Sequence, residues 1–406
     1  MPESNLSPFS ISIEDEVLAD LRARLRATRF APDLDNEDEK YGLSTTYLRG
    51  LVEFWAEKFD WRSVESRLNQ REQYRVEIGS TPVHFLRAST KSPNSKPLIL
   101  IHGWPWTYLD WTRTVDLLSN PADHGASDNA FEVIVPSLPG YGFSTPVSNG
   151  RENYVSMAER LHTLMTDILG HERYAVCGSD YGALVAAQMA HRHPDSVIGL
   201  HLGMPTPLPA FQGDRYWDIT GGQPVPEDAS PELRADLRAF VETLAPHLAV
   251  HALDAQTLTH GLADSPAGML AWILERWKRW SDRGASFEEV FPIEHILTNA
   301  TIYWVTQSIG SSIRVYKNAH LYPEPQADRT VPPVTVPTSF TLHLGDHASP
   351  GINNAEEYQT AIMQGTQSIY SDLREINVHE RGGHFGPWEQ PDAWASDLRD
   401  AFRDLS

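Results

Sequence analysis

The spacing of apolar residues predicts two helices near the start of the chain. Apolar residues from Leu18 to Leu25 recur on one face of a helix that Ser12 opens, and a second stripe predicts a helix over Thr45–Phe59. Neither segment holds a convincing set of catalytic residue types. Residues 1–70 are therefore expected to form a helical arm that packs against the rest of the protein.

From residue 71 onward, short apolar runs alternate with helical patterns. The helical patterns cover Tyr154–Leu169 and Ala183–His191. Alternation of this kind favours a mostly parallel, twisted sheet with helices on both faces. The expected strands are Tyr74–Ile78, Pro82–Leu86, Pro97–Ile101, Phe131–Val135, Tyr174–Cys177 and Val197–Leu202.

The pattern changes after residue 203, where tryptophan-rich helical segments replace the alternation. We interpret this stretch as a helical lid inserted into the α/β core. Its tryptophans either line a pocket for a bulky substrate or form the core of the lid, and we favour the core. Strands resume with Thr338–Leu344 and Glu375–His379. The predicted domains are the arm (1–70), the first part of the core (71–203), the lid (204–333) and the second part of the core (334–406).

Composition and charge exclude several classes of partner. The 406 residues include 33 basic and 54 acidic ones, and the formal net charge of -21 repels nucleic acid and anionic membranes. No uncharged run of about 18 residues predicts a membrane span. Cys177 is the one cysteine, which excludes an internal disulfide and fits the cytoplasm. The oligomeric state stays open between a monomer and a homodimer.

A short motif after the strand ending at Cys177 carries the first candidate chemistry. The sequence Gly178-Ser179-Asp180-Tyr181-Gly182 runs into a helix-forming stretch, which is the form of a nucleophile elbow, the turn typical of the α/β-hydrolase fold. Such a turn needs small residues two before and two after the nucleophile. Only the frame centred on Asp180 places glycine at both positions, so Asp180 is the candidate nucleophile and Ser179 the weaker one.

Two later residues stand where the partners of a nucleophile are expected. In this fold the chain order is nucleophile, acid, histidine. Asp346 follows the strand Thr338–Leu344, and His384 follows the strand that ends near His379. Taken singly, Asp346 is equally well explained by loop capping, and His384 by an ordinary surface position. The order of all three favours a catalytic triad.

A carboxylate nucleophile determines the mechanism. Asp180 is already ionised at pH 7, so its attack on an electrophilic carbon needs no base and produces an ester. His384, oriented by Asp346, is then free to activate the water that cleaves this ester. The backbone N–H groups of Tyr181 and Trp104 are the candidate oxyanion hole.

Metal binding is not expected. His343 and His347 flank Asp346, but their placement at a strand end is poor for a shared ligand face, and no zinc motif is present. We expect neither a metal nor another cofactor.

Several motifs together resemble the microsomal-type epoxide hydrolases. The resemblance spans nearly the whole chain, and the arm and lid motifs are its specific part. The matching segments are Ser7–Phe9, Tyr41–Leu43, Phe59–Arg62, His102–Pro105, Val135–Ser144, Gly178–Gly182, Asp264–Gly268, Ile302–Trp304 and Arg381–Phe385.

The resemblance implies the same nucleophile, acid, base and oxyanion hole, with an epoxide and water as substrates. It adds a ring-opening acid, because the family uses two lid tyrosines to protonate the departing alkoxide. One of these corresponds to Tyr316. The other position holds His247, by an ungapped count back from Asp264, and this departure puts activity or substrate range in doubt. A neutral imidazole donates a hydrogen bond, whereas an imidazolium donates a proton.

Three other functions remain as alternatives. A haloalkane dehalogenase shares the triad, but Tyr181 has no ring N–H for a halide and Tyr316 would have no role. A non-catalytic binding relative is favoured only by the His247 departure. An ester or lactone hydrolase that uses Ser179 is the weakest alternative.

Overall fold

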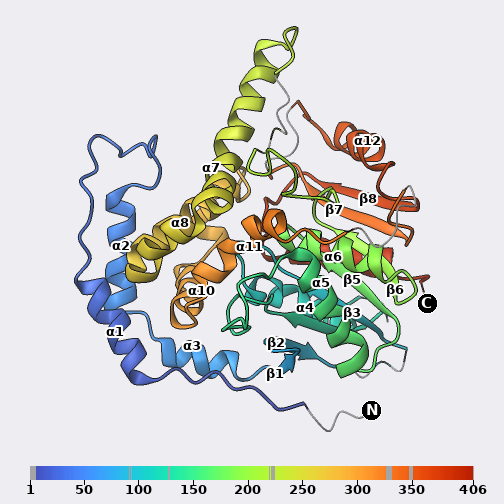
Figure 1. Ribbon diagram of the computed structural model, residues 1–406, viewed down its shortest axis with the longest axis horizontal. Helices are drawn as coiled ribbons and strands as arrows, with labels where there is room; N and C mark the ends of the chain where they lie inside the picture. The colour runs from blue at the N-terminus through green and yellow to red at the C-terminus, as the bar shows by residue number, and fades with distance from the viewer. Residues whose placement is uncertain are drawn as a thin grey trace.

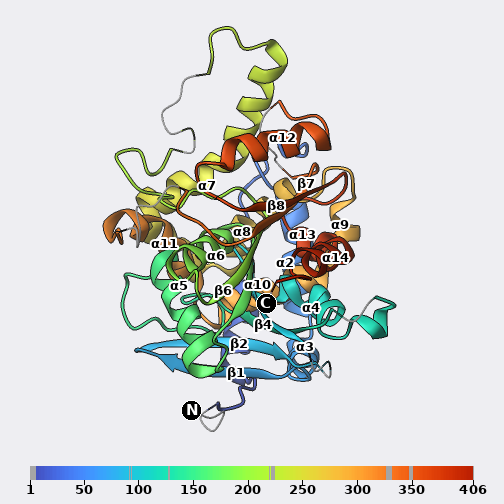
Figure 2. The same cartoon turned by 90° about the vertical axis from the view of Figure 1, so that its right-hand side faces the viewer.

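An eight-stranded sheet forms the centre of the protein. The computed structural model describes residues 6–90, 92, 94–126, 129–218, 220, 225–325, 332–346 and 351–405. The strand order is β1-β2-β4-β3-β5-β6-β7-β8; β2 is antiparallel to both of its neighbours, and all other neighbouring strands are parallel. The strands are β1 (Gln73–Ile78), β2 (Thr81–Ala88), β3 (Lys96–Ile101), β4 (Phe131–Pro136), β5 (Tyr174–Gly178), β6 (Val197–Leu202), β7 (Thr338–His343) and β8 (Leu373–His379). Figure 2 shows β1 and β2 at one edge and β8 at the other.

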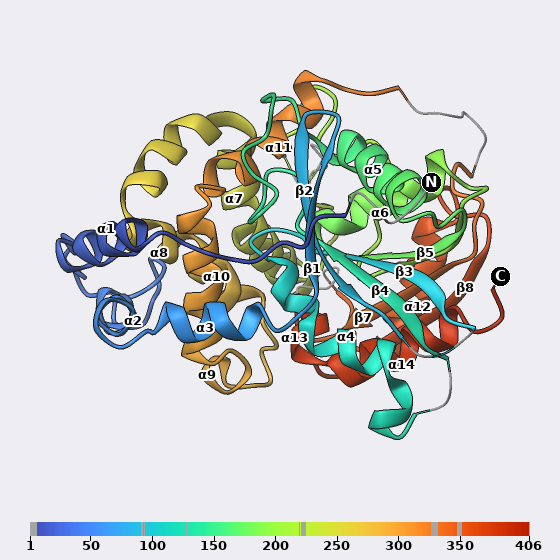
Figure 3. The ribbon, with the colours of Figure 1, turned by 90° about the horizontal axis from the view of Figure 1, so that it is seen from below.

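Helices cover both faces of this sheet, so the predicted α/β architecture is confirmed. Figure 3 shows α5 and α6 on one side of the strands and α4 and α14 on the other. The central strands are apolar throughout because both of their faces are buried; Leu98 to Ile101 of β3 have no exposed surface. The helices of the core are α4 (Thr112–Ser119), α5 (Tyr154–Thr163), α6 (Tyr181–Arg192), α12 (Ala355–Thr366), α13 (Gly386–Glu389) and α14 (Pro391–Ala401).

Between β6 and β7 the described residues form five further helices, which we call the helical insertion. The longest, α7, kinks at Asp254 and packs on α8 and α11, while its first half projects from the body of the protein (Figure 1). The insertion consists of α7 (Pro231–Asp264), α8 (Pro266–Trp280), α9 (Phe287–Val290), α10 (Ile293–Val305) and α11 (Ile309–Leu321).

The N-terminal arm differs from its prediction in two places. It contains α1 (Asp15–Arg26), α2 (Thr45–Glu57) and a third helix, α3 (Trp61–Leu68), which the apolar pattern did not predict. The expectation that Ser12 opens the first helix is wrong, because α1 begins at Asp15. The backbone near Ser12 is hydrogen-bonded to α3 instead, because the N–H of Ile13 donates to the Glu65 carboxylate at 2.8 Å.

The arm contacts the insertion rather than the sheet alone, and Figure 1 shows α1 and α2 beside α8. Arg24 donates to the Asp264 carboxylate at 2.9 Å, and the Trp55 indole N–H donates to Thr301 Oγ1 at 3.0 Å. The arm therefore braces the helices above the carboxyl ends of the strands. Among the described residues, no helix has the length and apolar character needed to cross a membrane.

Candidate active site

The sharp turn between β5 and α6 carries Asp180. Its φ of 53° and ψ of -130° are a combination that residues other than glycine rarely adopt. A Cβ on Gly178 would collide with the Gly182 carbonyl, and a Cβ on Gly182 would collide with the carbonyls of Ile101 and His102. The crowded backbone therefore requires glycine on both sides of Asp180.

The structure brings Asp180, His384 and Asp346 together in one hydrogen-bonded row. His384 Nε2 lies 3.1 Å from Asp180 Oδ2, and its Nδ1 lies 3.1 Å from Asp346 Oδ2. The three residues are far apart in sequence, but they follow β5, β7 and β8, whose carboxyl ends meet at one edge of the sheet. The rings of Trp106 and Trp280 meet His384 nearly at right angles, at 5.8 and 5.1 Å between centroids.

The two carboxylates control the charge of His384. Burial disfavours the charged ring, but the negative charge of Asp346 and hydrogen bonds to Asp180 and Asp346 outweigh it and raise the pKa of His384 to about 10. In this state the ring is an imidazolium at pH 7, and it donates a hydrogen bond to each carboxylate. The site therefore holds two negative groups and one positive group.

The backbone N–H of Trp104 meets the other side of the Asp180 carboxylate. The Trp104 N–H donates to Asp180 Oδ1 at 2.7 Å. Tyr181 is the first residue of α6, so its N–H has no partner within the helix. The Tyr181 side chain lies elsewhere: its hydroxyl donates to the Val315 carbonyl at 3.3 Å, and its ring lies 5.3 Å from that of Tyr316.

Tyr316 reaches the site from α11 of the insertion. Its ring is buried, and burial together with the charge of Asp180 raises the pKa of the Tyr316 hydroxyl well above its usual value. The phenol therefore keeps its proton at neutral pH until a stronger base, such as an alkoxide, meets it.

His247 lies on α7, close to Tyr316. The two ring centroids are 6.0 Å apart, and the imidazole also stacks on Trp104 at 5.5 Å. Burial, and then the positive charges of neighbouring groups such as Arg276, hold the pKa of His247 well below its usual value. At pH 7 this ring is neutral, so it offers hydrogen bonding rather than a proton.

Sequence reasoning missed His251, which lies one turn beyond His247 on α7. Its ring is 4.5 Å from Trp104 and 5.0 Å from Tyr316, and its Nε2 accepts a hydrogen bond from Trp272. The signal that could have found it is the spacing of four residues, which puts both histidines on one face of a helix.

No metal site is found in the part of the chain that the structure describes. Both ring nitrogens of His343 are engaged, since Nδ1 bonds the Arg381 carbonyl at 2.8 Å and Nε2 accepts from Trp394 at 2.9 Å. His347, the other histidine that flanks Asp346 in sequence, lies outside the described residues.

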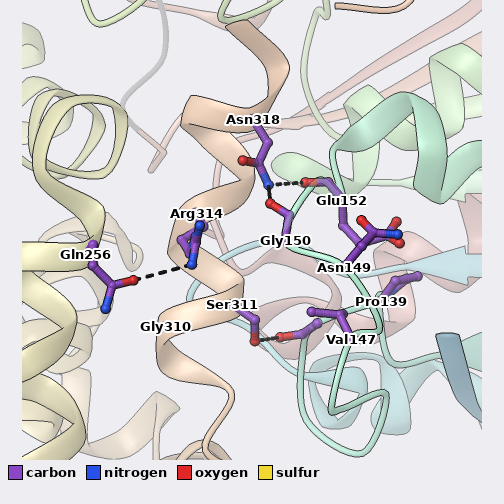
Figure 4. A pocket seen from close by; sticks show the side chains of 11 residues that line it. Pro139, Val147, Asn149, Gly150, Glu152, Gln256, Gly310, Ser311, Arg314 and Asn318 are labelled. Carbon is purple, nitrogen blue, oxygen red and sulfur yellow. Dashed lines mark hydrogen bonds between the residues drawn. The ribbon is translucent and has the colours of Figure 1, made fainter. Parts of the chain in front are cut away.

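A pocket of about 220 Å³ lies between α11, α7 and the loop after β4, but no residue of the Asp180 row lines it (Figure 4). Its lining includes Ser311, Arg314 and Asn318, on the side of α11 that faces away from Tyr316. This pocket is therefore distinct from the space around Asp180.

Comparisons with known proteins agree with this geometry. Residues 6–111 match the family model for the epoxide hydrolase N terminus, and residues 96–287 match the model for the alpha/beta hydrolase fold. Epoxide hydrolase 1 of Oryctolagus cuniculus is 30% identical over 98% of this chain and 89% of its own length. Juvenile hormone epoxide hydrolase of Bombyx mori is 30% identical over 98% of this chain and 86% of its own. The crystal structure of the silkworm enzyme superimposes with a TM-score of 0.78, at 26% identity, covering 98% of this chain and 94% of the other.

Proposed function

The chain belongs to the epoxide hydrolase family, and from this premise we propose that it converts an epoxide to a vicinal diol through an ester on Asp180. The observation that carries the proposal is the pair of contacts to that carboxylate. One oxygen faces His384 and the other faces the Trp104 N–H. The carboxyl group of Asp180, which is the nucleophile, thus has the base for the second step on one side and an oxyanion donor on the other.

In the first half-reaction, an Asp180 oxygen attacks an epoxide carbon. The C–O bond of the ring breaks, and the departing oxygen takes the proton of the Tyr316 hydroxyl. A neutral His247 contributes a hydrogen bond to that oxygen rather than a second proton. The product is a hydroxyalkyl ester of Asp180.

In the second half-reaction, His384 removes a proton from water, and the hydroxide attacks the ester carbonyl carbon. The N–H groups of Trp104 and Tyr181 stabilise the resulting oxyanion. The bond between that carbon and the alkyl oxygen then breaks, the diol leaves with the proton from His384, and one oxygen of the water remains on Asp180. Asp346 keeps the His384 ring oriented throughout.

Intact-protein mass spectrometry of a His384→Gln variant mixed with a panel of aryl epoxides tests the proposal. We expect an adduct on the peptide that carries Asp180, because ester formation needs no base while hydrolysis does. The adduct should disappear in a double variant that also carries Asp180→Ala. A panel with neither an adduct in the variant nor diol from the wild type would reject the proposal.

Haloalkanes in the same assay test the dehalogenase alternative. The observation in its favour is that the buried indole N–H groups of Trp104 and Trp280 have no acceptor among the residues that the structure describes. Halide release by the wild type without any diol from epoxides would favour that function.

A further inference from the structure

The loop that carries His384 is held along its whole backbone. Each of the four consecutive N–H groups from Gly382 to Phe385 has an acceptor either on Glu389 or at the carboxyl end of α8. The Gly382 N–H donates to Asp282 at 2.9 Å, and the His384 N–H donates to the Trp280 carbonyl at 2.8 Å. These hydrogen bonds connect the His384 loop to the carboxyl end of α8, directly and through Glu389.

Glu389 makes the central connection. Its Oε2 accepts from the N–H groups of Asp282 at 2.8 Å and Gly383 at 3.0 Å, and its Oε1 accepts from Phe385 at 3.0 Å. These donors come from the end of α8 and from both neighbours of His384. Burial of the carboxyl group raises the pKa of Glu389 to about 7, against the effect of the three N–H donors. Three donors suit a carboxylate because both of its oxygens only accept.

Asp282 extends this connection to the loop that bears Asp346. Its Oδ2 also accepts from the Arg381 guanidinium at 2.8 Å. A Cβ on Gly345, the residue before Asp346, would lie 2.7 Å from Asp282 Oδ1, so this loop passes against the same carboxylate. Burial acts to raise the pKa of Asp282, but the N–H donors and Arg381 outweigh it and leave that pKa lowered. The end of α8 therefore touches both loops that supply the second half-reaction.

We propose that Glu389 is a positioning residue for ester hydrolysis, which together with Asp282 fastens the His384 loop to α8 of the helical insertion. The inference rests on the proposed function. Glu389 touches no reacting atom and acts through the position of His384. Attack by Asp180 does not need a base, whereas hydrolysis does, so loss of this connection should slow the second step selectively. A misplacement of 1 Å costs roughly 10²-fold in rate.

Single turnovers with enzyme in excess over an aryl epoxide, quenched with acid and read by intact mass, separate the two steps. In Glu389→Gln, the amide nitrogen replaces a carboxylate oxygen, so a donor faces backbone N–H donors and cannot accept their hydrogen bonds. We expect ester formation within about threefold of wild type and hydrolysis slower by about 10²-fold, so that the ester accumulates. Glu380→Gln is the matched control, because Glu380 is exposed and belongs to the same loop region. Asp282→Asn is a second variant with the same expected direction, in case Glu389→Gln does not fold.

A selective loss of hydrolysis in a folded variant supports the inference. Unchanged hydrolysis in folded Glu389→Gln, or an equal loss in both steps, overturns it, because the residue then has no role or a merely structural one. Failure of the proposed function looks different, since neither wild type nor Glu380→Gln would form ester or diol. In that case, amide hydrogen exchange over residues 382–385 tests whether Glu389 holds the loop. Exchange that is no faster in Glu389→Gln than in Glu380→Gln overturns the inference.

Discussion

Gly103 is the position at which a single methyl group should disable the proposed nucleophile. A Cβ built on Gly103 would lie 2.6 Å from Asp180 Cγ and would also overlap Asp180 Cβ. Rotation of the Asp180 side chain about its first torsion does not move its own Cβ. The Gly103→Ala variant must therefore shift the backbone of the elbow or of the loop after β3.

The size of this shift follows from the contact distance. Non-bonded carbon atoms prefer a separation of about 3.5–4.0 Å, so the two segments must move apart by about 1 Å. Displacement of this size costs roughly 10²-fold in rate, and it also lengthens the bond from the Trp104 N–H to Asp180. Overpacking of a buried site destabilises a protein by about 1–3 kcal/mol, which a domain of ordinary stability survives.

Quenched single turnovers with an aryl epoxide measure the rate of ester formation, and thermal unfolding reports the fold. We expect Gly103→Ala to remain folded with ester formation about 10²-fold slower. Gly261→Ala is the control, because a Cβ at this exposed position of α7 would have no neighbour within 4 Å in the described part of the chain, apart from the backbone of its own helix. It should leave the rate unchanged and add up to about 1 kcal/mol of helix stability. A folded Gly103→Ala variant with ester formation within threefold of wild type would refute the reasoning.

Three further predictions concern the charged and proton-donating groups. The raised pKa of His384 in the folded protein means that its contribution to the free energy of unfolding is complete below about pH 6.5 and is lost as pH rises toward 10. In urea unfolding, the free energy of unfolding of wild type should therefore fall by up to about 1.4 kcal/mol per pH unit in this range, relative to that of His384→Gln. Tyr316→Phe should slow ester formation by about 10²–10⁴-fold in quenched single turnovers without unfolding the protein; a smaller effect would contradict its role as the acid. His247→Gln should preserve the dependence of ester formation on pH between 6 and 8, because the native ring is already neutral. A wild-type rate that falls as pH rises through this range, with the fall absent in His247→Gln, would show an imidazolium acting as the acid.

Much of the fold could be predicted because its signals are local. The buried strand Leu98–Ile101 is one apolar run, and the turn at Asp180 carries its two glycines within five residues. The order of Asp180, Asp346 and His384 follows from the connectivity of the sheet, so residues far apart in the chain could be placed at one edge of the sheet from their sequence positions alone.

The features that the sequence did not predict depend on tertiary contacts. The third arm helix has only eight residues, and Ser12 has the local pattern of a helix start although the nearby backbone is bound to Glu65, which lies far along the chain. Glu389 follows His384 by five residues, yet its partner at Asp282 is 107 positions away. No periodicity in either segment indicates that they meet.

The proton balance of the first half-reaction gives a final prediction. In the free enzyme His384 is an imidazolium, and ester formation removes the charge of Asp180, one of the two groups that raise its pKa. In the proposed mechanism the same step leaves Tyr316 as a phenolate, and burial holds the pKa of that hydroxyl well above its usual value. We therefore expect the proton of His384 to pass to Tyr316, which would restore the phenol and produce the neutral base needed for hydrolysis. A pH-indicator dye in weakly buffered solution at pH 8 should show no net proton uptake as wild type forms its ester, and uptake of about one proton per ester in His384→Gln. Equal uptake by both proteins would mean that His384 is already neutral before the epoxide binds.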